Sequence, residues 1–347
     1  MNKILDKYDT LIFDMDGVIT SENGYWDAAS LTVREFLVNR FDGEDIDVSD
    51  MSQNVKKIRS EVFFEDKLIT LLKGMGVNSN WDLGYITVLI ALVTGSRDAR
   101  DIYEYAKQLK GDIIDIYDRL AILAAKVMGE TPKDFMRSGK LWTDMRDCFQ
   151  EWYLGDKLFS EVYGCEPKTL GKTGIYKGET PIIPLDKLKA ILSELSHTKR
   201  LGIGTGRLRR EIVPLLREWD VLHNFDENAL CTYDYVVSAE KSIGATLTKP
   251  HPYMFLKSLY GLDYPDDKIA GGDYDKSKIS KTLVIGDAGA DILAAQAMGA
   301  DFCAVLTGVA GQSGRAYFEE QKSTYILDDI TYLVLQWRRC AVLYSRR

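Results

Sequence analysis

The amino-terminal part of the chain changes abruptly from apolar to acidic positions. Leu11, Ile12 and Phe13 form a short apolar run that ends at Asp14, and such a bounded run predicts a buried strand. From about residue 22 to residue 175 the pattern is different, because apolar positions recur at helical spacing and predict an all-helical block. The helices predicted in this block cover residues 28–38, 55–72, 102–127 and 141–158.

After Pro184 the pattern alternates between short apolar runs and amphipathic stretches. The runs predict strands, and the stretches between them predict helices. Strands that alternate with helices of this length indicate an α/β fold with a Rossmann-like, doubly wound parallel sheet. Right-handed crossovers then bring the carboxyl ends of all strands to one edge, where such folds bind ligands. The predicted strands are residues 201–203, 235–237, 283–285 and 302–306.

The helical block interrupts the α/β pattern just after its first strand. We therefore expect two domains, an α/β core of residues 1–21 with 180–347 and an inserted all-helical domain of residues 22–179. A length of 347 residues suits two modest domains better than one small core. The chain crosses between the domains twice, near residues 21–25 and 174–184, and two adjacent crossings would form a hinge.

The composition and charge of the chain argue against some classes of binding partner. A formal net charge of -8 argues against nucleic acid or an anionic membrane surface, because both require basic patches. The most apolar stretch, residues 86–93, is much shorter than the roughly 20 residues of a membrane-spanning helix. Five scattered cysteines without a CxxC pair indicate neither a zinc site nor a disulfide framework. We therefore expect a soluble, cytoplasmic protein.

The first candidate for chemistry is the acidic pair that ends the first strand. Asp14 and Asp16 stand at positions i and i+2, before Gly17, so two carboxylates at one strand end can perform different tasks. Asp14 could attack phosphorus, while Asp16 could protonate the leaving oxygen and later activate water. The alternative is a turn in which both residues only cap backbone groups.

A second acidic pair, Asp287 and Asp291, follows the strand predicted at residues 283–285. Four acids at one sheet edge would repel one another, so a hard divalent metal ion is the simplest explanation for their convergence. The alternative is that Asp287 or Asp291 merely caps the helix that follows.

Two further elements suit a phosphate group. Thr205 and Gly206 follow the strand predicted at residues 201–203, and a hydroxyl beside an unhindered backbone N–H can bind phosphate oxygens. Lys249, next to a proline, could neutralise phosphate and excess carboxylate. Taken alone, a single lysine is more often a solvated surface charge.

Four short motifs, in this order along the chain, resemble those of the haloacid dehalogenase (HAD) superfamily of phosphohydrolases: Asp14-x-Asp16, Thr205, Lys249, and Asp287 with Asp291. The segments 304–311 and 325–329 are similar to the branch of phosphoglycolate phosphatase and β-phosphoglucomutase. In that branch a helical cap is inserted between the first and second motifs, where this chain has its helical block. The insert is larger than the usual cap, so the resemblance does not identify the substrate.

The resemblance implies roles for individual residues. Asp14 would be the nucleophile that forms an aspartyl-phosphate, and Asp16 the general acid and base. Thr205, Gly206 and Lys249 would bind the transferring phosphoryl group. The substrate would be a small phosphorylated metabolite.

The same resemblance implies a magnesium ion. Mg²⁺ would be held by Asp14, by the backbone carbonyl of Asp16 and by Asp287, with Asp291 in support. The helical cap would close on the substrate and set specificity.

Two other functions remain open. A phosphomutase uses the same pair of acids but returns the phosphoryl group to its substrate, and a non-catalytic protein could use the scaffold for metal-dependent binding. The sequence indicates neither the substrate nor the oligomeric state, and residues 340–347 carry no interpretable pattern.

Overall fold

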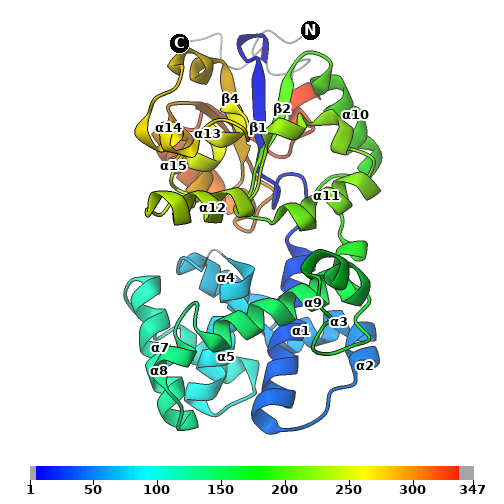
Figure 1. The fold of residues 1–347 in the computed structure, drawn as a ribbon, viewed down its shortest axis with the longest axis vertical. Helices are drawn as coiled ribbons and strands as arrows, with labels where there is room; N and C mark the ends of the chain where they lie inside the picture. Colours follow the sequence, from blue (N-terminus) through cyan, green and yellow to red (C-terminus); the bar gives the residue numbers. More distant parts are fainter. Residues whose placement is uncertain (1–4, 78, 336–347) are drawn as a thin grey trace. The chain divides into compact units, whose positions relative to one another are not determined.

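The computed structural model describes residues 5–77 and 79–335. The chain divides into two compact units (Figure 1). Met1–Glu22 with Thr180–Arg347 form the first, which we call the α/β unit, and Asn23–Glu179 form the second, the helical unit. Residues 340–347, which carry no interpretable sequence pattern, lie outside the described residues.

The α/β unit is built on a six-stranded sheet in the order β3-β2-β1-β4-β5-β6, and all its strand pairs are parallel. The predicted α/β class is thus confirmed. Strand β1 lies in the middle, with Phe13 in register with Ile203 of β2 and Ile285 of β4. The strands are β1 (Thr10–Phe13), β2 (Arg200–Gly204), β3 (Leu230–Cys231), β4 (Thr282–Gly286), β5 (Asp301–Val305) and β6 (Tyr325–Leu327).

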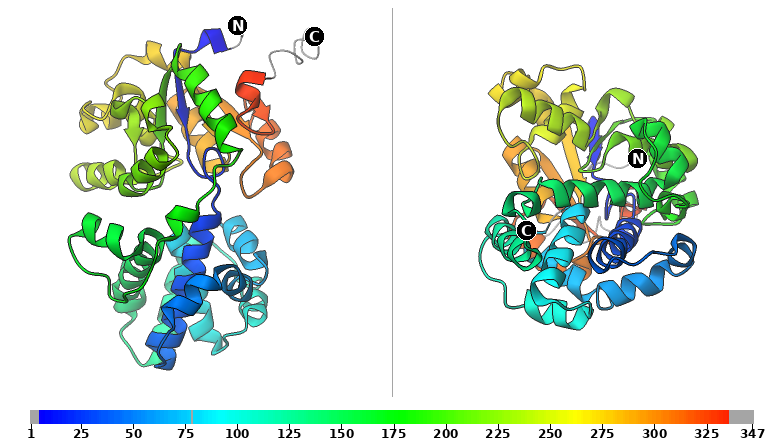
Figure 2. Two further views of the ribbon diagram at one scale, coloured as in Figure 1. Left: turned by 90° about the vertical axis from the view of Figure 1, so that its right-hand side faces the viewer. Right: turned by 60° about the horizontal axis from the view of Figure 1, so that its bottom comes forward.

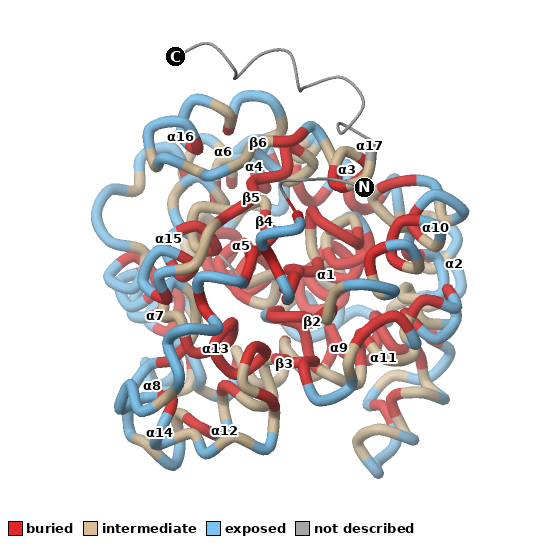
Figure 3. Tube along the Cα trace, turned by 90° about the horizontal axis from the view of Figure 1, so that it is seen from above, coloured by how far each residue is buried: buried red, intermediate tan, exposed pale blue. Residues whose placement is uncertain are grey.

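Helices cover both faces of this sheet (Figure 2). Leu11 and Phe13 of β1 belong to a core with α10, α11 and α17, whereas Ile12 belongs to a core with α12 to α16. This division follows from the alternation of side chains along a strand. The sheet is therefore buried on both sides: every residue of β1 and of β4 is buried, and buried segments of the chain are red in Figure 3. The helices are α10 (Leu185–Ser196), α11 (Arg209–Glu218), α12 (Tyr233–Ile243), α13 (Tyr253–Tyr260), α14 (Asp266–Gly271), α15 (Gly289–Met298), α16 (Arg315–Glu320) and α17 (Tyr332–Leu335).

The helical unit packs around α5, which is buried at every residue from Asp82 to Leu92 and contacts α1, α7 and α9. Within the described residues no helix has both the length and the apolar character needed to span a bilayer. The helices are α1 (Asn23–Glu35), the π-helix η2 (Phe36–Asp42), α2 (Val48–Gln53), α3 (Val55–Val62), α4 (Lys67–Gly74), α5 (Asn80–Thr94), α6 (Ala99–Ala106), α7 (Ile113–Met128), α8 (Pro132–Phe135) and α9 (Lys140–Tyr163).

Three predicted helices are interrupted in the structure. The prediction over residues 141–158 is broken at Gly155 of α9, whose φ of 74° and ψ of 162° are not helical. The prediction over residues 102–127 is divided between α6 and α7, with Gly111 at positive φ in the connection. The prediction over residues 55–72 is divided between α3 and α4 by three consecutive residues at positive φ, from Phe64 to Asp66. Arg59 donates to both carboxylate oxygens of Asp66 at 2.8 and 2.6 Å. This bidentate pair stabilises a turn that apolar periodicity does not reveal.

The strand predicted at residues 235–237 is wrong. These residues lie in α12, and the edge strand β3 is instead Leu230–Cys231. Val236 is fully buried on the helix, so its apolar character reflects helix packing. A run of three residues is too short for its period to distinguish a helix from a strand.

A buried ionic network ties the returning chain of the helical unit to its bundle. The ammonium group of Lys172, which is inaccessible to solvent, lies 2.6 Å from Glu151 and 3.0 Å from Glu35. Glu35 also accepts hydrogen bonds from Trp152 at 2.7 Å and Thr169 at 2.8 Å. The network joins α1, α9 and the segment that follows α9.

We expect Lys172→Met to lower the free energy of unfolding by about 3–5 kcal/mol, because it leaves two buried carboxylates without their cation. Urea unfolding followed by circular dichroism would measure the change. Lys168→Met is the matched control, since its side chain is 62% exposed and pairs with Asp144 at the surface; its cost should stay below about 1 kcal/mol. Equal effects of the two substitutions would contradict this account.

Candidate active site

The sheet brings the predicted site residues to one edge. Asp14 directly follows β1, Thr205 follows β2, and Asp287 follows β4. These three strands are parallel neighbours, so their carboxyl ends lie side by side. The backbone N–H of Asp14 still donates to Ile285 at 2.9 Å, which continues the strand pairing by one residue and fixes the start of the first loop.

Lys249 lies at the centre of the acidic cluster. Its ammonium nitrogen is 3.0 Å from Oδ1 of Asp14 and 2.8 Å from Oδ1 of Asp291, and all three side chains are almost inaccessible to solvent. Burial opposes the charge of Lys249, but the two carboxylates outweigh this effect and raise the pKa of its ammonium group. Lys249 is therefore a fixed cation at this edge, and the surface-charge alternative does not apply.

Three carboxylates converge on the same point, since one oxygen each of Asp14, Asp287 and Asp291 lies within 4.8 Å of the others. Burial raises the pKa of Asp14 to about 7; Lys249 opposes this rise, and repulsion from Asp291 and Asp16 adds to it. The pKa of Asp287 is raised well above its ordinary value, mainly by burial and to a smaller extent by repulsion from Asp291 and Asp14.

This donor set fits a hard divalent cation. Carboxylate oxygens are the preferred ligands of Mg²⁺, and a 2+ charge would offset the burial and the mutual repulsion that raise the pKa values of Asp14 and Asp287. Asp291 also accepts a hydrogen bond from the backbone N–H of Ala288 at 3.2 Å, so it caps α15 while it pairs with Lys249.

Asp16 is held by a residue to which the sequence assigned no role. Nε of Arg207 donates to its two carboxylate oxygens at 3.0 and 3.1 Å, and a terminal guanidinium nitrogen lies 2.5 Å from Oδ1. Thr20 donates to the same Oδ1 at 3.2 Å. The available signal was the position of Arg207 in the chain, directly after the proposed phosphate-binding pair.

Thr205 and Gly206 form the loop that begins after β2. Thr205 is buried, and its hydroxyl oxygen accepts a hydrogen bond from the backbone N–H of Arg207 at 3.2 Å. Gly206 is exposed, and a Cβ atom there would meet no other atom within 4 Å. The loop thus offers an open backbone beside a buried hydroxyl.

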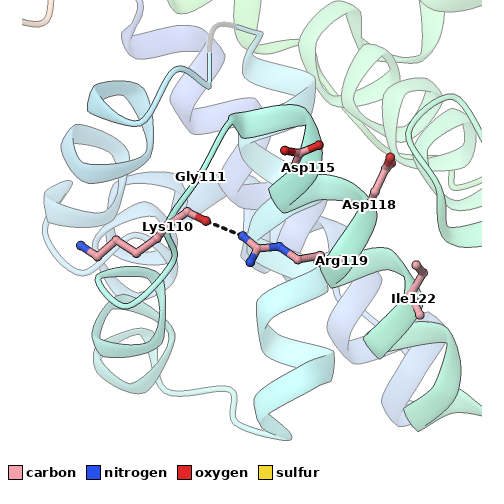
Figure 4. Close-up of a pocket in the computed structure, with 6 residues that line it drawn as sticks. All are labelled: Lys110, Gly111, Asp115, Asp118, Arg119 and Ile122. Atoms are coloured by element: carbon pink, nitrogen blue, oxygen red, sulfur yellow. Dashed lines mark hydrogen bonds between the residues drawn. The ribbon is translucent and has the colours of Figure 1, made fainter.

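The pocket in Figure 4 lies elsewhere, in the helical unit, and contains none of these residues. Arg119 donates to the backbone carbonyl of Lys110 at its rim. Asp115 and Asp118 balance the two basic residues, so the pocket has no marked charge preference.

Comparison with known protein families finds a match that includes residues of this sheet edge. Residues 246–333 match the model of a family described as HAD-hydrolase-like, and the matched range includes Lys249, Asp287 and Asp291. This part of the α/β unit is therefore HAD-hydrolase-like. The family resemblance and the enzyme class predicted from the motifs are therefore confirmed. The curated proteins gave no match.

Solved structures include relatives of this HAD-like fold. A Northeast Structural Genomics Consortium target, solved by X-ray crystallography, is 27% identical and superposes with a TM-score of 0.79 over 94% of this chain and 97% of that chain. Its likeness therefore extends across both units. A phosphatase from Thermococcus thioreducens is 20% identical, with a TM-score of 0.49 over 84% and 90% of the chains. A haloacid dehalogenase-like hydrolase from Streptococcus pneumoniae is 14% identical, with a TM-score of 0.43 over 96% and 100%.

Two glycines of the HAD-like site enclose the carboxylate of Asp287. A Cβ atom at Gly17 or at Gly308 would overlap that carboxylate, and Gly17 has a φ of +71° that favours glycine. The hydroxyl of Thr307 donates to the backbone carbonyl of Gly17 at 2.5 Å. The loop after β5 therefore supports both the β1 loop and Asp287, a role that the sequence did not indicate.

We expect Gly308→Ala to weaken Mg²⁺ binding at least tenfold, because the added methyl group must displace the carboxylate of Asp287; loss of outer-shell support at metal sites typically costs about 10–100-fold in affinity. Isothermal titration calorimetry with Mg²⁺ would measure it. Gly271→Ala, at the end of α14 where a Cβ atom meets nothing within 4 Å, is the matched control. An unchanged dissociation constant for Gly308→Ala would show that Asp287 needs no such support.

Proposed function

We propose that this HAD-like hydrolase is a magnesium-dependent phosphomonoesterase that acts on a small phosphorylated metabolite through an aspartyl-phosphate on Asp14. One observation carries the proposal: the buried ammonium group of Lys249 lies between Asp14 and Asp291, at 3.0 and 2.8 Å. This arrangement opposes the protonation of Asp14 that burial favours. An ionised, oriented carboxylate is what attack on phosphorus requires.

The proposed reaction has two steps. In the first, a carboxylate oxygen of Asp14 attacks phosphorus, the bond from phosphorus to the leaving oxygen breaks, and Asp16 gives that oxygen a proton. In the second, water attacks the phosphorus of the aspartyl-phosphate, Asp16 takes up a proton from the water, and inorganic phosphate leaves. Asp14 is restored as a carboxylate and Asp16 as a carboxylic acid, so atoms and charges balance.

Charge neutralisation supports the same proposal. Mg²⁺ held by Asp14, Asp287 and the backbone carbonyl of Asp16, with Asp291 in support, would supply positive charge to the transferring phosphoryl group. Lys249 would neutralise the same oxygens from the protein side. Thr205 and the backbone N–H of Gly206 would complete the phosphate cradle, since the hydroxyl hydrogen of Thr205 is free to turn toward it.

We further propose that the helical unit acts as the cap that sets specificity and excludes water during transfer. The net charge of -8 favours a small substrate over nucleic acid. Cys148, Cys165, Cys231 and Cys303 are free thiols, which supports the proposed location in the reducing cytoplasm.

Asp14→Asn is expected to lower kcat for 4-nitrophenyl phosphate with Mg²⁺ by a factor of at least about 10³, because an amide cannot form the acyl phosphate. Steady-state release of nitrophenol would measure it. Asp9→Asn is the matched control, since Asp9 stands before the other end of β1 and pairs with Lys281 at the surface; it should retain the wild-type rate. A wild-type rate in Asp14→Asn would rule out the aspartyl-phosphate.

Removal of divalent cations with EDTA should abolish hydrolysis, and added Mg²⁺ should restore it, because the carboxylate cluster repels an incoming phosphate dianion. The phosphate released from a panel of phosphorylated metabolites would be the measure, with circular dichroism to show that the fold survives. Activity that resists EDTA would contradict the proposal. A radiolabelled phosphoenzyme that transfers its phosphoryl group to a sugar phosphate and not to water would identify a phosphomutase instead.

A further inference from the structure

Arg207 and Asp16 form a two-point ion pair between two loops of the α/β unit. Nε of the guanidinium lies 3.0 and 3.1 Å from the two oxygens of Asp16, and a terminal nitrogen lies 2.5 Å from Oδ1. Asp16 belongs to the loop after β1, and Arg207 to the loop after β2. Both nitrogens converge on Oδ1 and Nε also reaches Oδ2, so these charge-assisted bonds hold Oδ1 and restrict rotation of the carboxylate.

The side chain of Arg207 is buried and its backbone is anchored. The side chain of Arg207 is 1% exposed, its backbone N–H donates to the hydroxyl of Thr205 at 3.2 Å, and its backbone carbonyl accepts from Tyr233 at 2.9 Å. A buried side chain on a backbone that is held at both its N–H and its carbonyl has few other conformations available. Arg207 is therefore a rigid support.

Asp16, in contrast, remains reachable. Its side chain is 24% exposed, and its second contact, with Thr20, is a longer hydrogen bond of 3.2 Å within the same loop. A carboxylate on a short loop has several available rotamers. The pair with Arg207 selects one of them and leaves part of the group open to a substrate.

We propose that Arg207 is a positioning residue that holds the ionised carboxylate of Asp16, the form it has between the two steps, in the orientation for taking up a proton from the attacking water. This rests on the function proposed above, in which Asp16 is the general acid and base. Arginine suits the task better than lysine, because its planar fork fixes two directions at once, whereas an ammonium group acts as a point charge. The alternative is that Arg207 binds the substrate phosphate directly, and the two roles affect kinetics differently.

A double-mutant cycle distinguishes the roles. Arg207→Met, Asp16→Asn and the double variant are assayed with 4-nitrophenyl phosphate and Mg²⁺. If Arg207 acts through Asp16, Arg207→Met alone lowers kcat about 10–100-fold, within the range that general acid–base catalysis supplies, and changes KM by less than about threefold. In the Asp16→Asn background the same substitution changes kcat by less than about twofold. Additive effects on kcat, or a loss confined to KM, would overturn the proposal.

Controls separate positioning from folding. Arg217→Met, at the exposed end of α11, should leave both constants unchanged. Arg207→Lys keeps the charge but loses the fork, so it should recover only part of kcat, and it serves as the second variant if Arg207→Met does not fold. Calorimetric Mg²⁺ affinity should stay within about twofold in the Arg207 variants, because the expected metal-binding atom of Asp16 is its backbone carbonyl.

A crystal structure of Arg207→Met gives a readout that does not need activity. The carboxylate of Asp16 should leave its present rotamer, while Asp14, Lys249 and Asp291 keep their contacts. An Asp16 that stays in place would overturn the positioning role even if the wild-type protein hydrolyses phosphate esters. The opposite combination is a displaced Asp16 in Arg207→Met together with a wild-type protein that does not hydrolyse phosphate esters. That result would support the positioning role and contradict the proposed function.

Discussion

The rest of the site depends on the ion pairs that the ammonium group of Lys249 forms with Asp14 and Asp291. Burying carboxylates as close as those of Asp14, Asp287 and Asp291 is unfavourable, because each loses hydration and repels the others. Lys249 offsets part of that cost for Asp14 and Asp291 at once. It also leaves a net negative charge that a further cation can balance. The same arrangement therefore explains why a nucleophile can be buried here and why the site fits a metal ion.

The sheet determines which residues meet around Lys249. Phe13 pairs with Ile203 and with Ile285, so the residues after three different strands arrive at one level. Two of the loops begin with a backbone bond to a neighbouring strand, from Asp14 to Ile285 and from Thr205 to Cys231. A slip of one residue in β1 would exchange its two faces and move Asp14 away from its partners. Apolar packing on both faces of β1 therefore sets the geometry of the charged edge.

The sequence predicts this edge well because the acids follow apolar runs directly, and parallel strands must end together. It predicts far less of what supports the acids. The pairing of Arg207 with Asp16 crosses two loops, and loops carry no periodic signal from which a direction could be read. Gly308 also carries no sequence signal, because it matters only through the close approach of the Asp287 carboxylate. The turn at Phe64 to Asp66 escaped prediction because the nearby pair of Arg59 and Asp66 leaves no periodic signal. The short strand β3 escaped prediction because it depends on β2, a partner distant in the sequence.

The loops of the α/β unit hold one another as much as the core holds them. The β1 loop carries Asp16 and is supported by Arg207 from the β2 loop and by Thr307 from the β5 loop. A charge-assisted hydrogen bond contributes only about 1.5–3 kcal/mol, which is small beside the burial of two faces of a six-stranded sheet. Removing one such support should therefore disturb the orientation of a carboxylate long before it unfolds the unit. Because transfer of a proton or a phosphoryl group depends on sub-ångström placement, supporting residues of this kind affect the rate of reaction more than the stability of the fold.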